Sequence, residues 1–291
     1  MKAKGQRLEG KGTEGTSANG SDPARTFGLS PSTFNLPIVI LPGIQGHWEW
    51  MRPAIDALRR TREVRTFSLN VEDGQSDPFA QWVDLIDKAI DEMGVTQAAI
   101  IGVSFGGLVA VHYAATRPER TAALVLVSAP SPRMSLAPAE AMLVGRPLLL
   151  VPLLPLFATR ALQRMLPEIM TAITSWPDRL RFLATYSWQV ARRPMRPTQS
   201  ARWVREWQRR DLAAECAQIQ APTHVITGEV TLDQVVRIRS THDYLSLIPG
   251  TTTATLDRTG HIGLVTRPAA FAALVEEFLH GLDSSRSRRP A

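Results

Sequence analysis

Short apolar runs alternate with amphipathic stretches along much of the chain, a pattern typical of strands and helices in succession. The apolar runs are rich in Val, Ile and Leu at consecutive positions, so both faces of each strand would be buried. Such strands favour a parallel sheet with helices packed on both sides. The strands expected in the first half are residues 37–41, 64–69, 98–103 and 122–128, and the helices are residues 50–62, 79–93 and 108–117.

The alternation is interrupted between residues 130 and 212, where Pro, Arg and Trp are frequent, helical patches dominate and no strand is expected. It resumes with strands at 223–228 and 252–257 and helices at 233–247 and 268–280. The interrupted stretch is therefore predicted to be a helical insertion within one domain. The predicted fold class is α/β, with a mostly parallel sheet and helices on both faces.

These patterns divide the chain into a core at residues 35–130 and 212–281 and a helical insertion at 131–211. Residues 1–34 are rich in Gly, Ser, Thr and Lys and poor in large apolar side chains, so they are expected to be a disordered extension. Residues 282–291 are polar and basic and are expected to form a flexible tail.

The longest apolar run, PLLLVPLLPLF at 147–157, is broken by Pro152 and Pro155 and is shorter than the roughly 20 residues that span a bilayer. No transmembrane segment is therefore expected. The lysines near the N-terminus are not followed by an apolar stretch, which argues against a secretory signal. The single cysteine, Cys216, excludes an internal disulfide framework and a multi-cysteine metal site, and the expected location is cytoplasmic.

The formal charge of +6 is unevenly distributed. Residues 131–210 contain thirteen Arg and four acidic residues, a net charge of +9, whereas residues 36–130 and 211–281 together carry −7. The acidic core and the lack of a recognised binding motif argue against nucleic acid as a partner. Arg outnumbers Lys 29 to 4 over the whole chain, so most arginines of the insertion are interpreted as solvated. The alternative is that they meet an anionic substrate or a lipid surface.

The strongest chemical signal is GVSFG at residues 102–106, which matches G-x-S-x-G between an expected strand and an expected helix. A serine on a tight strand-to-helix turn has a strained backbone, and glycine two residues to either side relieves the crowding. The start of a helix also favours negative charge. The position between a strand and a helix makes Ser104 the candidate nucleophile. The alternative is that the motif is an ordinary strand–helix turn without a catalytic role.

A serine hydroxyl needs an adjacent base, and the base needs an acid that orients it. His261 lies in a Gly-flanked loop directly after a strand, which places it at the same edge of the sheet as Ser104. Glu229 and Asp233 both follow the strand at 223–228, and spacing alone leaves either as the acid. Among the other histidines, His224 is interpreted as a packed core residue, His242 and His280 as surface residues, and His47 as a capping, surface or pocket-lining residue, while His112 closely follows the GVSFG turn.

These segments resemble the serine-type α/β-hydrolase superfamily, over residues 37–130 and 212–281, with the insertion where that family carries its lid. The segments that carry the resemblance are GVSFGG at 102–107, RPER at 117–120, TGE at 227–229, DQVV at 233–236, GH at 260–261 and TRP at 266–268. In that family the acid usually begins a D-x-x-V-P string. DQVVR at 233–237 matches it except for Arg237, so the resemblance implies Asp233 over Glu229.

The resemblance also implies an oxyanion hole made by the backbone N–H groups of Phe105 and Ile44. The family often has His-Gly in the loop that supplies the second donor, where this chain has Pro42-Gly43, but a backbone donor does not require the histidine. Because residues 1–34 are expected to be disordered, too little ordered chain precedes Ile38 for the antiparallel strands that usually begin the family's sheet. The sheet is therefore expected to start one or two strands late.

A serine at this position indicates acyl chemistry, because related enzymes of other kinds have Asp or Cys there. The resemblance implies a serine hydrolase that cleaves a carboxylic ester, thioester or related acyl bond through an acyl-enzyme, with no cofactor and no metal. The expected partner is a small acyl substrate, hydrophobic or anionic, and the oligomeric state is left open. The alternatives are an acyltransferase or carbon–carbon bond hydrolase with the same triad, and a non-catalytic hydrolase-like protein that binds a ligand.

Overall fold

A computed structural model of the chain describes residues 35–70 and 77–286. Within these ranges the chain forms a six-stranded sheet of order β2-β1-β3-β4-β5-β6, in which every neighbouring pair is parallel. The first strand of the described part begins at Ile38, and the expectation that the sheet starts one or two strands late stays a prediction. The strands are β1 (Ile38–Leu41), β2 (Val64–Thr66), β3 (Ala98–Val103), β4 (Thr121–Val127), β5 (Thr223–Thr227) and β6 (Thr252–Thr255).

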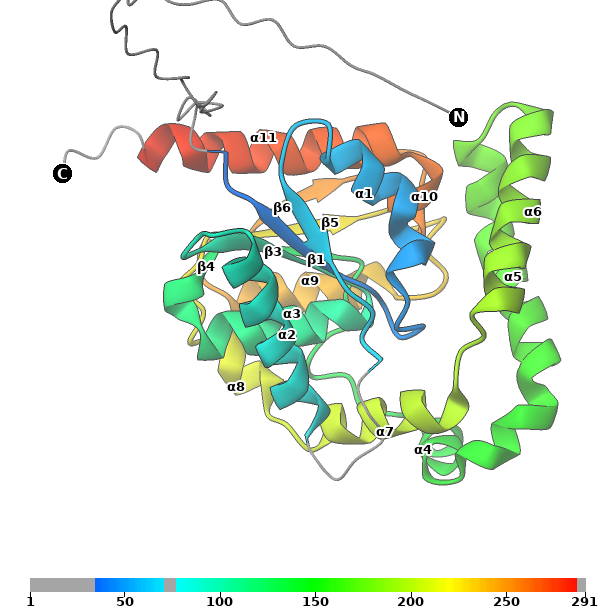
Figure 1. The fold of residues 1–291 in the computed structure, drawn as a ribbon. Helices are drawn as coiled ribbons and strands as arrows, with labels where there is room; N and C mark the ends of the chain where they lie inside the picture. Colours follow the sequence, from blue (N-terminus) through cyan, green and yellow to red (C-terminus); the bar gives the residue numbers. More distant parts are fainter. Residues whose placement is uncertain (1–34, 71–76, 287–291) are drawn as a thin grey trace, which may run out of the picture. The chain divides into compact units, whose positions relative to one another are not determined.

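Helices connect successive strands and cover the sheet (Figure 1). The α-helices are α1 (Arg52–Leu58), α2 (Pro78–Glu92), α3 (Phe105–Thr116), α4 (Pro138–Gly145), α5 (Leu154–Ala172), α6 (Trp176–Arg192), α7 (Pro197–Gln208), α8 (Leu212–Cys216), α9 (Ile238–Leu247), α10 (Gly263–Thr266) and α11 (Pro268–Arg286). Three short 3-10 helices are η1 (Trp48–Met51), η2 (Pro118–Arg120) and η3 (Pro147–Leu153). The predicted α/β class with a mostly parallel sheet is confirmed.

Each face of the sheet has its own apolar core, because alternate residues of a strand point to opposite faces. Val39 and Leu41 of β1 pack with residues of α2, α3, α8 and α9. Ile38 and Ile40 of the same strand pack with residues of α1, α10 and α11. Figure 1 shows these layers, with α1 and α11 on one side of the sheet and α2 and α3 on the other. Burial on both faces accounts for the continuously apolar strand sequences.

The helix expected over 233–247 begins only at Ile238, as α9. Asp233 lies before it in a turn, where its Oδ1 accepts hydrogen bonds from the backbone N–H groups of Val235 and Val236. A short acidic side chain that binds its own downstream backbone competes with helix formation, which explains the later start.

A flexible tail is expected to begin at residue 282, but α11 continues to Arg286. The expected start of the tail at 282–291 is therefore too early. The continuation of α11 is stabilised by Asp283, which is buried and forms an ion pair of 2.9 Å with the buried Arg62 in the turn between α1 and β2. A contact over this sequence distance leaves no trace in local composition. Residues 287–291 and the extension expected at 1–34 lie outside the described residues.

The stretch between β4 and β5 contains helices and, over its described residues, no strand. Its four tryptophans divide into two groups. Trp203 and Trp207 of α7 are buried in the core cluster that contains α2 and α3, so α7 packs on the domain itself. Trp176 and Trp188 of α6 are 61% and 60% exposed. Helix α7 therefore packs in the main core although it precedes the expected boundary at residue 211.

The helical stretch Pro147–Ala172 is, among the described residues, long and apolar enough by length and composition to cross a membrane. The apolar run at 147–157 gains this length because η3 continues directly into α5. Three residues of α5, Met165, Glu168 and Ile169, are nevertheless buried against the domain. Length and composition are weak evidence for a span, and the expectation of none stays a prediction.

Candidate active site

Ser104 stands between β3 and α3, at the carboxyl end of a central strand. Its backbone angles are φ 50° and ψ −122°, a strained conformation for a residue with a side chain. The flanking glycines make this turn possible. A Cβ on Gly102 would lie 2.5 Å from the Gly106 carbonyl oxygen, and one on Gly106 would lie 2.5 Å from the Pro42 carbonyl oxygen. The sterically required turn predicted from GVSFG is present.

His261 follows β6 in the loop before α10, and its Nε2 lies 3.2 Å from Ser104 Oγ. The two residues are 157 positions apart in the sequence, so the fold alone brings them together. Gly228 allows the approach, because a Cβ there would lie 2.5 Å from the Thr259 carbonyl oxygen and 2.6 Å from that of Gly260. The structure thus places His261 within hydrogen-bonding distance of Ser104, as the spacing predicted.

Of the two candidate acids, Asp233 is the one beside the histidine. Its Oδ1 lies 3.6 Å from His261 Nδ1, and the Asp233 side chain is 1% exposed. The distance is longer than a hydrogen bond, and His261 Nδ1 is buried without a partner among the described residues. Glu229 instead accepts a hydrogen bond of 2.6 Å from the backbone N–H of Arg258. Its carboxylate joins two loops and is not directed at the imidazole.

The two backbone donors expected for an oxyanion hole lie on either side of Ser104. Phe105 is the first residue of α3, so its N–H has no acceptor within the helix. The turn that carries Ile44 approaches the nucleophile closely, since a Cβ on Gly43 would lie 3.4 Å from Ser104 Cβ. No hydrogen bond to the N–H of Phe105 or Ile44 is found within residues 35–70 and 77–286.

Glu168 is a buried carboxylate of this site that the sequence did not identify. It lies on α5, is 1% exposed, and accepts hydrogen bonds from the residue after His261. Burial raises its pKa above the ordinary value of 4.5, and hydrogen bonds to its oxygens oppose the rise. The spacing of apolar residues could have indicated its burial, because Met165, Glu168 and Ile169 are three and four positions apart and lie on the same, buried side of α5.

The remaining histidines stay outside this arrangement. His224 is packed as expected, with its ring 4.8 Å from that of Phe278, and burial lowers its pKa. His242 and His280 are exposed, also as expected. His47 Nδ1 lies 3.4 Å from Asn70 Nδ2. Within the described ranges no group of three or more His, Cys, Asp or Glu side chains is arranged to hold a metal ion.

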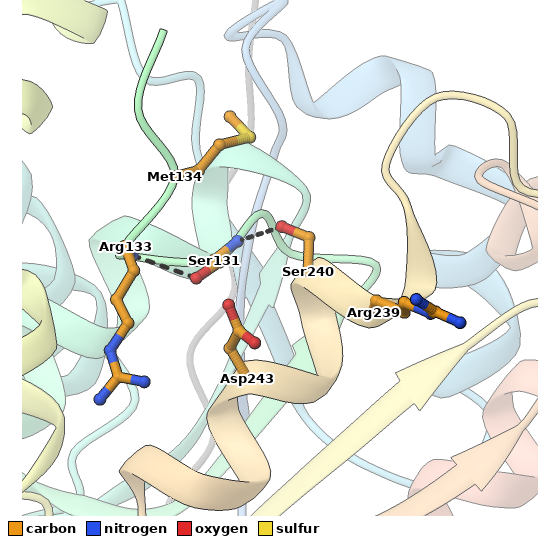
Figure 2. A pocket seen from close by; sticks show the side chains of 6 residues that line it. All are labelled: Ser131, Arg133, Met134, Arg239, Ser240 and Asp243. Atoms are coloured by element: carbon orange, nitrogen blue, oxygen red, sulfur yellow. Dashed lines mark hydrogen bonds between the residues drawn. The ribbon is translucent and has the colours of Figure 1, made fainter.

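Ser104 lines neither of two hollows found among the described residues. Figure 2 shows the more open one, where Ser240 on α9 accepts a hydrogen bond of 2.8 Å from the backbone N–H of Ser131. Arg133 and Asp243 also line it, and none of its residues belongs to the Ser104 and His261 pair. The smaller hollow is closed in by Gly228, Gly260, His261 and neighbouring residues.

A family model described as "alpha/beta hydrolase fold" matches residues 37–268. A curated poly(3-hydroxyalkanoate) depolymerase of Ectopseudomonas oleovorans is 34% identical over 97 residues, which are 32% of this chain and 34% of that protein. The match therefore spans about a third of the relative.

Two solved structures are similar over most of their length. A hydrolase from Pseudomonas aeruginosa is 23% identical, with a TM-score of 0.63, over 84% of this chain and 90% of that one. An enol-lactonase from Burkholderia xenovorans is 19% identical, with a TM-score of 0.63, over 85% and 92%. Likeness at these identities shows the fold.

Proposed function

The chain belongs to the alpha/beta hydrolase family, and from that premise we propose that it is a serine hydrolase acting on a carboxylic ester, thioester or related acyl bond. The observation that carries the proposal is the 3.2 Å contact between Ser104 Oγ and His261 Nε2, with the buried Asp233 on the other side of the ring. Nucleophile, orienting acid and base follow one another along this chain as Ser104, Asp233 and His261, which is the chain order of serine α/β-hydrolases.

In the proposed reaction Ser104 Oγ attacks the acyl carbon while its proton passes to His261 Nε2. The carbonyl oxygen becomes an oxyanion, which the N–H groups of Phe105 and Ile44 would stabilise. The tetrahedral intermediate collapses when His261 returns the proton to the leaving alcohol or thiol, leaving an acyl-enzyme. A water molecule then gives a proton to His261 as it attacks the acyl carbon. The second tetrahedral intermediate collapses when His261 returns that proton to Ser104 Oγ, which releases the carboxylic acid and restores the serine hydroxyl.

Asp233 would stabilise the imidazolium that forms on His261. The 3.6 Å separation leaves room for the ring to move toward the carboxylate, because catalytic hydrogen bonds often shorten only once substrate is bound. The two backbone N–H groups that already bind Asp233 Oδ1 hold the carboxylate in place during this movement.

We expect a hydrophobic acyl group in the substrate. The helices between β4 and β5 present large exposed apolar side chains, among them Leu148, which is 72% exposed, and Trp176. A concentration of exposed apolar surface marks a binding face, and we propose that these helices form a lid over the acyl group. The curated relative's poly(3-hydroxyalkanoate) is a polyester and belongs to the same class of substrate.

An anionic group on the substrate is the second expectation for this lid. Arg160 and Arg164 lie one turn apart on α5, are both exposed, and form no ion pair with the described residues. We therefore expect a dicarboxylic half-ester to be cleaved with a higher kcat/KM than its methyl ester. Ester pairs of this kind, assayed with wild type and with R160Q/R164Q, test the expectation, which fails if the preference is absent or survives in the variant.

The proposal is tested with p-nitrophenyl esters of increasing acyl length and with a poly(3-hydroxyalkanoate) suspension. Wild type should release p-nitrophenol with a burst whose amplitude equals the enzyme concentration, because acylation precedes slower deacylation. Ser104→Ala should abolish both the burst and the turnover. Binding of the esters without release of product by wild type would favour the non-catalytic alternative.

The lid is tested separately with Leu162→Ser/Leu166→Ser on α5. These residues are 41% and 42% exposed, and Leu245 on α9, which is 38% exposed, provides the matched control Leu245→Ser. Each methylene group of the acyl chain that loses an apolar contact costs about 0.8 kcal/mol of binding energy. If the double variant removes two such contacts from a long acyl chain, kcat/KM for the long ester relative to the short ester should fall about 15-fold. An unchanged ratio in the double variant would remove these helices from the acyl site.

A further inference from the structure

Glu168 places a carboxylate of the inserted helix α5 directly against the chain on both sides of His261. Its Oε2 accepts a hydrogen bond of 3.0 Å from the backbone N–H of Ile262, and its Oε1 accepts one of 3.0 Å from Thr266 Oγ1. The backbone of Gly260 also donates to this carboxylate. One side chain therefore holds the residue before His261, the residue after it and the end of α10.

The surroundings of Glu168 make these hydrogen bonds stronger than surface ones. The side chain is 1% exposed and lies between Met165 and Ile169, which pack against Ile262 in a small apolar cluster. In such a setting a carboxylate is stable only when its oxygens are bound, and a fully bound polar group fixes the geometry of its partners. Removing it would leave the Ile262 N–H buried without an acceptor.

The imidazole of His261 itself has few restraints. Its Nδ1 makes no hydrogen bond within the described part of the chain, and Asp233 stands 3.6 Å away. The position of Nε2 relative to Ser104 is consequently set by the backbone of the loop, and the side chain that binds that backbone on both sides is Glu168.

We propose that Glu168 is a positioning residue for His261, through which α5 must be docked on the domain before the histidine is aligned with Ser104. This inference rests on the proposed function for its kinetic consequences. Through its hydrogen bonds, Glu168 would couple the helices that receive the acyl group to His261, the base that would activate Ser104. Glu168 touches neither substrate nor the reacting atoms.

The charged and titratable side chains around this loop include Asp233 and Glu229 in the loop after β5, Arg258 in the loop before His261, and the phenol of Tyr186 on α6, whose pKa is raised to about 12 by burial and by Glu168. Burial raises the pKa of Glu168, and the neighbouring His261 opposes the rise, so the carboxyl group and the imidazole interact electrostatically.

Two variants separate charge from hydrogen bonding. In Glu168→Gln the amide oxygen can accept from Ile262 N–H, and the amide NH₂ can donate to Thr266 Oγ1, so the contacts are retained without the charge. Glu168→Ala removes both. Asp283→Asn is the matched control, because Asp283 is also buried, also accepts from a backbone N–H (that of Leu36) and lies at the far end of α11.

Each variant is assayed for kcat and KM with a p-nitrophenyl ester, at temperatures where circular dichroism shows it folded. Glu168→Ala should lower kcat about 10- to 100-fold with little change in KM, because misplacement of a catalytic group by about 1 Å costs up to this much. Glu168→Gln should recover most of the loss. Asp283→Asn should leave kcat and KM near their wild-type values.

A second readout does not depend on turnover. In protein labelled with ¹³C-histidine, the His261 signal is assigned by its absence in His261→Gln. Its chemical shift should change in Glu168→Ala, return close to the wild-type value in Glu168→Gln and stay unchanged in Asp283→Asn. If wild type shows neither burst nor hydrolysis, the proposed function is wrong, and the chemical shift still decides the place of Glu168. If wild type is active and Glu168→Ala keeps its kcat, or the His261 signal is the same in Glu168→Ala as in wild type, the positioning role is overturned.

Discussion

Gly106→Ala is expected to disturb both stability and the proposed oxyanion hole, through a single added methyl group. A Cβ on Gly106 would lie 2.5 Å from the Pro42 carbonyl oxygen and 2.7 Å from that of Leu41. Both neighbours are backbone atoms at the end of β1, so no side chain can rotate away, and α3 and the 42–44 turn must separate. The turn carries the Ile44 N–H, so that donor moves relative to Ser104.

The magnitude follows from two opposing terms. Overpacking a close contact costs about 1–3 kcal/mol, and backbone neighbours put this site at the upper end. Replacing Gly by Ala within a helix contributes about 1 kcal/mol in the other direction. Gly106→Ala should therefore lower the free energy of unfolding by about 2 kcal/mol. Displacement of one oxyanion donor should also lower kcat about 100-fold.

Gly281→Ala on α11 is the matched control, because a Cβ there meets no atom within 4 Å. It should raise the free energy of unfolding by up to about 1 kcal/mol and leave kcat unchanged. Urea unfolding followed by circular dichroism gives the stabilities, and p-nitrophenyl ester hydrolysis gives kcat. The steric reasoning is refuted if the two variants have equal unfolding midpoints and equal kcat.

Three further expectations concern charged groups. In the ester assay, Asp233→Asn should lower kcat by a factor on the order of 10⁴. Glu229→Gln should keep a kcat near wild type, because its amide oxygen can still accept the hydrogen bond from the backbone. The reverse result would make Glu229, and not Asp233, the acid of the triad. Arg62→Met should cost about 3–5 kcal/mol in urea unfolding by leaving Asp283 buried without its partner, and a cost below about 1 kcal/mol would contradict this. Burial raises the pKa of Glu168 above 4.5, so wild type should be most stable relative to Glu168→Gln below pH 4.5 and should lose this advantage as pH rises through the raised pKa. Thermal melts over pH 4–8 would contradict this if the stability of wild type relative to Glu168→Gln increased with pH.

The sheet and the turn that carries Ser104 could be predicted from the sequence because their causes are local. Continuous apolar runs mark strands buried on both faces, and GVSFG marks a turn that only glycine at 102 and 106 permits. His261 was found from its place after a strand. In a parallel sheet the carboxyl ends of the strands meet at one edge, so a histidine directly after a strand is expected near Ser104.

Contacts between distant segments could not be predicted in the same way. Glu168 is one acid in a basic insertion, and only the docking of α5 on the His261 loop shows its role. The extension of α11 to Arg286 depends on the pair of Asp283 with Arg62, 221 residues away. The burial of Trp203 beside Phe105, with 6.1 Å between their rings, likewise depends on packing across the fold.

The most direct test of the proposed triad is the site and rate of reaction with a fluorophosphonate, read by intact mass and peptide mapping. Wild type should gain one adduct, on Ser104, and Ser104→Ala should gain none. His261→Ala should remain folded and react at least about 10³-fold more slowly, because the serine then lacks its base. Labelling of Ser104→Ala at the wild-type rate, or an adduct on another residue, would contradict the assignment of Ser104 as the nucleophile.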